Sequence, residues 1–231
     1  MNSIDYTPIW LSLEASLMSS IFLVIFGILV AKFMSENNFK GKDVLDGLFV
    51  LPLVVPPVVV GFLLLVLFGK YGPLGIFLKN TFGISIVFTI YAAAIASFIV
   101  SFPLMYKSAR SAFEEVDDNL KDAAKTLGAG NWKIFFTITV PLSSRGLISG
   151  FIIAFARALG EFGATIMVAG DIPGVTNTVP IQIFFATENG QMHEAFFYVA
   201  IICLINLILI FISNKISRKK ASYKGLENAK S

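Results

Sequence analysis

A pair of opposite charges stands inside an otherwise uncharged apolar stretch. Arg157 and Glu161 are four residues apart, and no other charged residue occurs between about 147 and 169. At 100° per residue the two side chains share one face of a helix, where they can form an ion pair. A charge in the middle of a bilayer costs about 2.5–3.5 kcal/mol on insertion scales, so the pair should face protein or a water-filled path. Two roles remain open: a lock between helices, or a guide for an anion.

Two consecutive prolines interrupt another apolar stretch, from about 47 to 69. Pro56 and Pro57 remove two backbone donors, and their rings clash with the preceding turn, so a helix must break or kink there. Within lipid such a break is tolerated only where protein or water satisfies the freed backbone groups. Broken helices often line the path of a solute. Pro56, Pro57 and nearby Gly61 are therefore a candidate gate, and a packing kink explains the same residues equally well.

A polar segment from about 113 to 141 has the pattern of a short helix that leaves room for a partner. Asp117 and Asp118 suit the start of a helix, where carboxylates meet the positive end of its dipole. Pro141 fits the first turn of the helix that follows the segment. Between them come small or apolar residues at helical spacing, and then the glycines that end the helix: Ala123, Ala124, Leu127, Gly128 and Gly130.

These features belong to a chain with five apolar stretches, each long enough for the roughly 20-residue helix that crosses a bilayer. The stretches span about 10–31, 47–69, 84–106, 147–169 and 195–214. Of the 231 residues, 56% are hydrophobic and only 14% are charged, and the mean hydropathy is +0.79. Such a composition excludes a disordered chain and an ordinary soluble enzyme. We predict an all-α, multi-pass membrane protein with about five transmembrane helices.

The basic residues are divided unevenly between the two sides of this predicted bundle. Clusters of Lys and Arg follow the first, third and fifth stretches, whereas only Lys70 and Lys79 lie in the segments on the other side. Cytoplasmic segments of membrane proteins carry the excess of Lys and Arg. We therefore predict a membrane domain over 10–214, a cytoplasmic basic tail over 215–231 and, after five crossings, an external N-terminal segment over 1–9. The net charge of +3 then reflects topology and not a nucleic-acid partner.

Few residues could carry covalent or metal chemistry. Cys203 is the only cysteine and His193 the only histidine, which excludes an internal disulfide and a cysteine metal cluster and argues against a zinc site. The sequence also lacks the glycine-rich loop ending in lysine that holds nucleotide phosphates. We expect no catalytic residue, metal or cofactor in this chain.

The polar segment carries a resemblance to a known family. It runs Asp122-Ala123-Ala124-x3-Gly128-x9-Ile138-x-Val140-Pro141. This resembles the EAA loop of ABC importer permeases, Glu-Ala-Ala-x3-Gly-x9-Ile-x-Leu-Pro, at every spacing. Asp122 stands for Glu, and Val140 stands for Leu. The runs 41–61 and 155–174 are similar to the molybdate or tungstate permeases in particular, with the sulfate permeases as close relatives.

The resemblance implies a fold, partners and a mechanism. It implies the type I ABC importer permease fold, in which the loop over 113–141 holds a coupling helix that docks on an ATPase subunit. It further implies a homodimer in the lipid bilayer, two cytoplasmic ATPase subunits that bind ATP and Mg, and an external binding protein for molybdate or tungstate. Import would proceed by alternating access.

Three alternatives remain beside a molybdate or tungstate permease. A sulfate or thiosulfate permease subunit fits the same resemblance. An ATP-independent channel or secondary transporter would explain the apolar helices and Arg157, but not the spacing of the EAA-like loop. A membrane-embedded enzyme is disfavoured because the apolar stretches contain no pair of facing carboxylates and no histidine.

Overall fold

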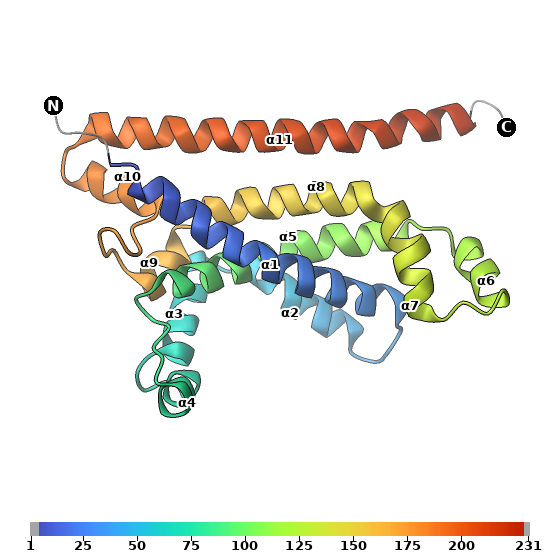
Figure 1. Ribbon diagram of the computed structural model, residues 1–231, viewed down its shortest axis with the longest axis horizontal. Helices are drawn as coiled ribbons and strands as arrows, with labels where there is room; N and C mark the ends of the chain where they lie inside the picture. Colours follow the sequence, from blue (N-terminus) through green and yellow to red (C-terminus); the bar gives the residue numbers. More distant parts are fainter. Residues whose placement is uncertain (1–4, 229–231) are drawn as a thin grey trace.

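Four long helices run side by side along the length of the molecule (Figure 1). The computed structural model describes residues 5–228, with side chains described as far as Ser217, and every regular element in this range is helical. The long helices are α1 (Thr7–Glu36), α5 (Ile90–Glu114), α8 (Val140–Leu159) and α11 (Met192–Asn228). The prediction of an all-α membrane protein is confirmed, since each of the four belongs to an apolar segment long enough to cross a bilayer.

The second expected span, 47–69, is not one straight helix. It forms α2 (Lys42–Val54) and α3 (Pro57–Phe68), which are bent by 109° relative to each other at the two prolines. A fifth crossing therefore exists only if this bent pair is counted as one span. Beyond the bend, α3 turns away from the long axis and leads to α4 (Pro73–Phe82), which stands apart from the bundle (Figure 1).

The fourth expected span, 147–169, differs from the structure at both ends. Its helical path begins earlier, because α7 (Asn131–Ile134) and the π-helical turn η1 (Phe135–Thr139) lead directly into α8. It also ends earlier, because α8 stops at Leu159, and a separate short helix, α9 (Gly163–Ala169), follows the break. The hydropathy of the stretch does not reveal this break, since both halves are apolar.

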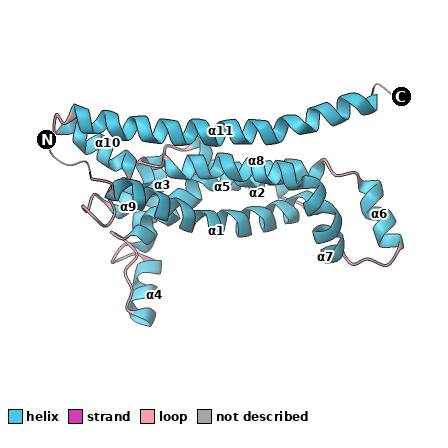
Figure 2. Ribbon diagram, turned by 45° about the horizontal axis from the view of Figure 1, so that its top comes forward, coloured by secondary structure: helices cyan, strands magenta, loops and turns pink. Residues whose placement is uncertain are grey.

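Shorter helices gather at the two ends of the bundle. Figure 2 shows α4, α9 and α10 (Val179–Glu188) near one end and α6 (Asp118–Thr126) with α7 at the other. The segment between the fourth and fifth expected spans thus contains a helix, α10, that the hydropathy pattern did not reveal. The start of α1 lies at the end with α10, and the last turns of α11 lie at the end with α6 (Figure 1).

Glycine lets the long helices approach each other closely. A Cβ added to Gly150 of α8 would lie 2.3 Å from the Cβ of Ser108 on α5, and one on Gly146 would lie 2.7 Å from the Cβ of Ala112. Small residues at helix crossings are the usual means of packing within a membrane, where lipid removes the hydrophobic drive between helices. The α5–α8 contact is therefore fixed by backbone approach rather than by large side chains.

Candidate functional site

The break between α8 and α9 is organised by Glu161. Glu161 as a whole is 3% exposed, and its Oε1 accepts a hydrogen bond of 2.8 Å from the backbone N–H of Ala164, in the first turn of α9. A carboxylate at this position satisfies a free donor and complements the positive end of the helix. The other oxygen, Oε2, lies 2.7 Å from Nη1 of Arg157. The predicted ion pair is present, but the two residues do not share one helix as their spacing predicted: α8 ends at Leu159, and the pair bridges the end of α8 and the start of α9.

The two members of this pair have different surroundings. The side chain of Glu161 is 1% exposed, whereas that of Arg157 is 31% exposed. Among the residues whose side chains the structure describes, Glu161 is the one ion-pair partner of Arg157. The guanidinium has five N–H donors, so part of it is free to meet a ligand or a second subunit. The pair can lock the helix break and still present positive charge.

The proline break between α2 and α3 has a clear local cause. Pro56 and Pro57 lack backbone donors, and Val55 before them is extended, as residues preceding proline prefer. Pro57 then begins α3, where the missing N–H is no loss. An additional proline, Pro52, sits inside α2. The sequence prediction of a broken helix at Pro56 and Pro57 is confirmed, while its role as a gate stays a prediction.

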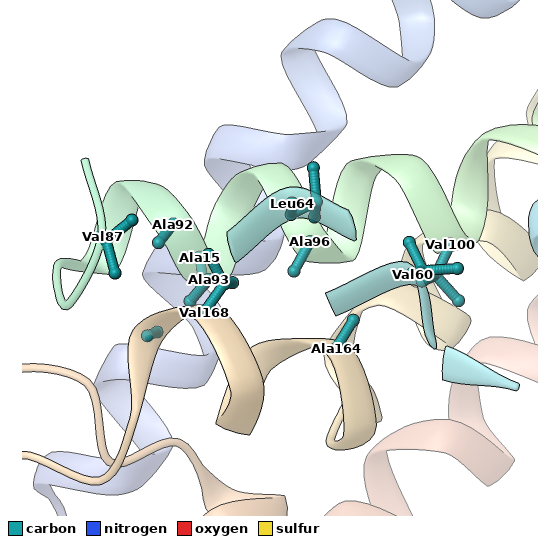
Figure 3. Packing of buried hydrophobic residues seen from close by; sticks show 11 residues of the cluster. Ala15, Val60, Leu64, Val87, Ala92, Ala93, Ala96, Val100, Ala164 and Val168 are labelled. Atoms are coloured by element: carbon teal, nitrogen blue, oxygen red, sulfur yellow. The ribbon is translucent and has the colours of Figure 1, made fainter. Parts of the chain in front are cut away.

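The two breaks lie against each other. A Cβ on Gly61 of α3 would lie 2.7 Å from the carbonyl oxygen of Ala164 in α9, so the two backbones are in direct contact there. A Cβ on Gly163 would lie 3.1 Å from the Cβ of Pro57. Figure 3 shows Ala164 on α9 close to Val60 of α3 within a shared buried cluster. The structure thus brings together two features that the sequence presents separately.

Small residues of α5, most of them alanines, pack against the contact between α3 and α9. The cluster contains residues of α1, α3, α5 and α9, and its α5 members are almost all small: Ala92, Ala93, Ala96 and Val100 (Figure 3). Small side chains allow α3 and α9 to pack close to α5. The contact between the two broken helices is therefore buried against one of the long helices.

The predicted short helix exists as α6. The carboxylate of Asp117 accepts a hydrogen bond of 2.9 Å from the backbone N–H of Asn119, which caps the start of the helix. After the last turn, Gly128 adopts a φ of +80°, the left-handed conformation that favours glycine. No residue of α6 is buried, and Leu127 is 88% exposed. The segment lies at the tip of the molecule (Figure 1), and its residues are exposed or half-buried.

Two ion pairs shape the charge of α6. Nζ of Lys121 lies 2.9 Å from Asp118, and this hydrogen bond lowers the pKa of the Asp118 carboxyl. Nζ of Lys125 lies 2.9 Å from Asp122, and this hydrogen bond raises the pKa of the Lys125 ammonium. Asp122, the residue that departs from the family's glutamate, is thus engaged within its own helix. Ala123 is exposed beside it, and Ala124 is half-buried.

The last part of the EAA-like pattern lies on the helical path into the bundle. Ile138 belongs to η1, and Pro141 lies in the first turn of α8, as predicted. The π-helical turn directly precedes Pro141, where proline removes a backbone donor. The helical path from α7 into α8 thus contains an irregular turn just before Pro141.

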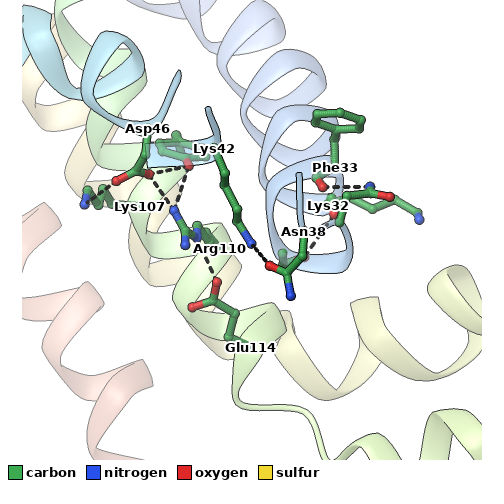
Figure 4. A network of polar contacts seen from close by, with 11 residues as sticks. Lys32, Phe33, Asn38, Lys42, Asp46, Lys107, Arg110 and Glu114 are labelled. Atoms are coloured by element: carbon green, nitrogen blue, oxygen red, sulfur yellow. Dashed lines mark hydrogen bonds and ion pairs between the residues drawn. The ribbon is translucent and has the colours of Figure 1, made fainter. Parts of the chain in front are cut away.

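A polar network that the sequence reasoning missed joins α2 to α5 (Figure 4). Asp46 of α2 accepts a hydrogen bond of 2.6 Å from the hydroxyl of Tyr106 and one of 2.5 Å from Nη1 of Arg110. Arg110 also donates from Nε to Glu114 at 2.7 Å, and Lys107 lies 3.5 Å from Asp46. The network holds α2, the half of the broken helix before the bend, against α5. The i,i+4 spacings of Tyr106 with Arg110 and of Arg110 with Glu114 were the signals available in the sequence.

The one histidine and the one cysteine of the chain lie outside these segments. His193 is exposed in the first turn of α11, and Cys203 is exposed further along the same helix. In the part of the chain that the structure describes, no three His, Cys, Asp or Glu side chains gather into a metal site. At the end of the bundle opposite α6, burial raises the pKa of the Asp171 carboxyl in the loop after α9.

Known proteins resemble this chain over most of its length. Residues 23–222 match the family described as "Binding-protein-dependent transport system inner membrane component". The molybdenum transport system permease protein ModB of Escherichia coli strain K12 is 44% identical over 215 residues, which are 92% of either chain. ModB of Haemophilus influenzae is 41% identical over 209 residues, 90% of either chain. The sulfate transport system permease protein CysW of Synechocystis is 31% identical over 202 residues, 87% of this chain and 73% of CysW.

Solved structures share the fold at low sequence identity. A chain of a bacterial ABC transporter that imports the acidic polysaccharide alginate matches with a TM-score of 0.71 at 17% identity, covering 92% of this chain and 78% of that one. A chain of the MetNI methionine ABC transporter in an inward-facing conformation matches with a TM-score of 0.66 at 15% identity, covering 92% and 94%. The fold is that of type I ABC importer permeases. The chain belongs to the family of inner membrane components of binding-protein-dependent transport systems, and it is a multi-pass transport subunit of the cell membrane, not an enzyme.

Proposed function

We propose that this chain is the membrane permease subunit of an ATP-driven importer for molybdate, with tungstate as a further substrate. The proposed substrate rests on the 44% identity to ModB of Escherichia coli over 92% of both chains. The proposed mechanism rests on α6, a capped helix with no buried residue that lies at the tip of the bundle. Its sequence has the spacing of the EAA loop from Asp122 to Pro141.

The importer contains two copies of this chain. One protomer leaves the far side of α3 uncovered: Phe62 and Leu63 are about half exposed, while the opposite side of the helix packs on α9. Five crossings are too few to enclose a solute path without a second subunit. The two-fold axis then brings the broken helices of both copies to the centre of the assembly, where helix breaks can be satisfied by protein and water.

ATP is bound and hydrolysed elsewhere in the assembly. Two cytoplasmic ATPase subunits hold ATP and Mg, and each accepts one α6 in a groove. The end of the molecule with α6 is the cytoplasmic one, because the basic segments collect there. The N-terminus is then external and the C-terminus cytoplasmic. The external binding protein delivers the oxyanion to the opposite end, near α9 and α10.

Arg157 and Glu161 divide two tasks between them. Glu161 is buried and caps α9, whereas the side chain of Arg157 is 31% exposed. In the proposed dimer, this exposed part of Arg157 faces the path at the two-fold axis. A guanidinium is suited to an oxyanion because its planar donors match tetrahedral oxygens. Its pairing with Glu161 keeps the site from holding the anion too tightly to release it.

Sulfate is the second candidate substrate, favoured by the 31% identity to CysW. The two substrates are separated by competition. Proteoliposomes that contain the permease, its ATPase subunits and its binding protein are loaded with ATP and offered radiolabelled molybdate. Excess tungstate should suppress the uptake of labelled molybdate, and sulfate at the same concentration should not. Suppression by sulfate with direct uptake of labelled sulfate would assign the chain to sulfate instead.

A further inference from the structure

A buried lysine joins α1 to the segment that follows α6. Lys32 and Glu161 are the two charged residues that are buried in the part of the chain whose side chains are described. Lys32 lies near the end of α1, and its side chain is 11% exposed. Burying an ammonium is unfavourable unless it is paired. A specific set of partners must therefore hold it in place.

The partners of Lys32 come from two different parts of the chain. Glu36, one turn further along α1, forms an ion pair with it. The ammonium also lies over two aromatic rings, 5.0 Å from the centroid of Trp132 and 4.9 Å from that of Phe135. Both distances are within the range of cation–π attraction. Trp132 belongs to α7 and Phe135 to η1, so the cation holds the start of the α7–η1–α8 path against the end of α1.

Lys32, Glu36, Trp132 and Phe135 together form a clamp between α1 and the α7–η1–α8 path, and its two aromatic rings also contact the rest of the bundle. Phe135 is 2% exposed and packs edge-to-face on Phe113 of α5 at 5.4 Å, as well as on Trp132 at 6.0 Å. Trp132 in turn stacks on Phe136 at 5.9 Å. The clamp therefore connects three helices at one point, just where the π-helical turn gives the path an irregular register.

The helix α6 has no comparable hold on α1. A cavity of about 290 Å³ separates them, and it is lined mainly by polar side chains, among them Ser35, Glu36, Asp118, Lys121, Lys125 and Asn131. The main packing partners of α6 are α7 and η1. The packing route from α6 to α1 therefore runs through α7 and η1. Lys32 is the charged side chain that joins these elements to α1, beside Ala31 and Met34 of α1, which belong to the same buried cluster as Phe135.

We propose that Lys32 is a positioning residue for energy coupling, which transmits the movement of α6 to α1 by clamping Trp132 and Phe135. The proposal rests on the proposed function, since it takes α6 as the helix that docks on the ATPase. Lys32 touches neither ATP nor the oxyanion. Its loss should therefore alter how many ATP molecules are hydrolysed for each molybdate imported, and should leave the ATPase sites intact.

The test measures this ratio in proteoliposomes that contain the complete importer. Lys32→Met keeps the apolar stem and removes the charge, and Lys32→Arg keeps the charge over the rings. Lys40→Met is the matched control, because Lys40 is an exposed lysine in the loop after α1. We expect the ratio of ATP hydrolysed to molybdate imported to rise several-fold in Lys32→Met, and to stay at the wild-type value in Lys32→Arg and Lys40→Met.

An unchanged ratio in Lys32→Met overturns the proposal. If Lys32→Met does not assemble, Trp132→Leu removes one ring at an exposed position and must raise the ratio in the same direction, and an unchanged ratio in that variant is equally decisive. Parallel loss of hydrolysis and import in both variants, with no rescue by Lys32→Arg, assigns Lys32 a structural role only and also overturns the proposal. Absence of ATP-driven molybdate import by the wild type would instead refute the proposed function, and this inference with it.

Discussion

Removal of Glu161 should harm the protein more than removal of the whole ion pair. Glu161→Ala deletes the acceptor for the N–H of Ala164 and leaves the guanidinium of Arg157 without its partner. Losing a helix cap costs about 1 kcal/mol. Breaking a buried ion pair by removing one member costs about 3–5 kcal/mol. Because the Arg157 side chain is 31% exposed, water can solvate part of it, and we take about 2 kcal/mol for the pair.

The expected order of stability follows from these magnitudes. Glu161→Ala should lose about 3 kcal/mol, whereas the double variant Arg157→Ala with Glu161→Ala should lose only the cap, about 1 kcal/mol. For a chain of this size 1 kcal/mol corresponds to about 2–4 °C in the unfolding midpoint. Glu161→Gln is the matched control, since its amide oxygen can still cap α9 but carries no charge.

The assay combines thermal unfolding of the purified dimer in detergent with molybdate uptake after reconstitution. If Arg157 only locks helices, the double variant should recover most of the uptake together with the stability. If Arg157 guides the anion, the double variant should be nearly as stable as the wild type but should not transport. An unfolding midpoint of Glu161→Ala equal to that of the wild type would refute the reasoning, because the buried carboxylate would then stabilise neither α9 nor Arg157.

Three further outcomes follow from the same structure. Ala124→Arg places a long charged side chain on α6 and should abolish ATP-driven uptake while the permease still dimerises, and full uptake would show that α6 does not dock. Gly61→Leu drives a side chain into the backbone of α9 and should cost more than the about 1–3 kcal/mol typical of overpacking, measured as a fall in the unfolding midpoint; a wild-type midpoint would contradict the contact. In a Cys203→Ser background, a cysteine introduced within 175–192 should react with an impermeant thiol reagent from outside, and one within 114–120 should not. Labelling of both from one side would contradict the proposed orientation.

The features that the sequence predicted well are those with a local physical cause. Two adjacent prolines break a helix wherever they occur. Residues four apart, such as Arg157 and Glu161, are close enough in sequence to pair even though the helix ends between them. Asp117 and Gly128 mark the start and end of α6 through their own backbone preferences. None of these requires knowledge of what packs against the segment.

The features that sequence reasoning missed depend on tertiary contacts. The break after Leu159 follows a run of good helix formers, and it is stabilised by Glu161 once α9 packs on α3. The contact between Gly61 and α9 joins segments about a hundred residues apart, which hydropathy and spacing do not relate. Lys32 looked like a simple flanking charge in the sequence, and its aromatic partners lie in a distant segment that the pattern presented as a connector.

ATP-dependent molybdate uptake by the reconstituted importer tests the central claim most directly. Proteoliposomes are prepared with wild-type permease, its ATPase subunits and its binding protein, and matched samples lack ATP, lack the binding protein or carry Ala124→Arg. The account predicts that radiolabelled molybdate accumulates against its gradient only in the complete sample with ATP. Equal accumulation without ATP would contradict it, because the chain would then transport as a channel or secondary carrier and α6 would have no ATPase to receive it.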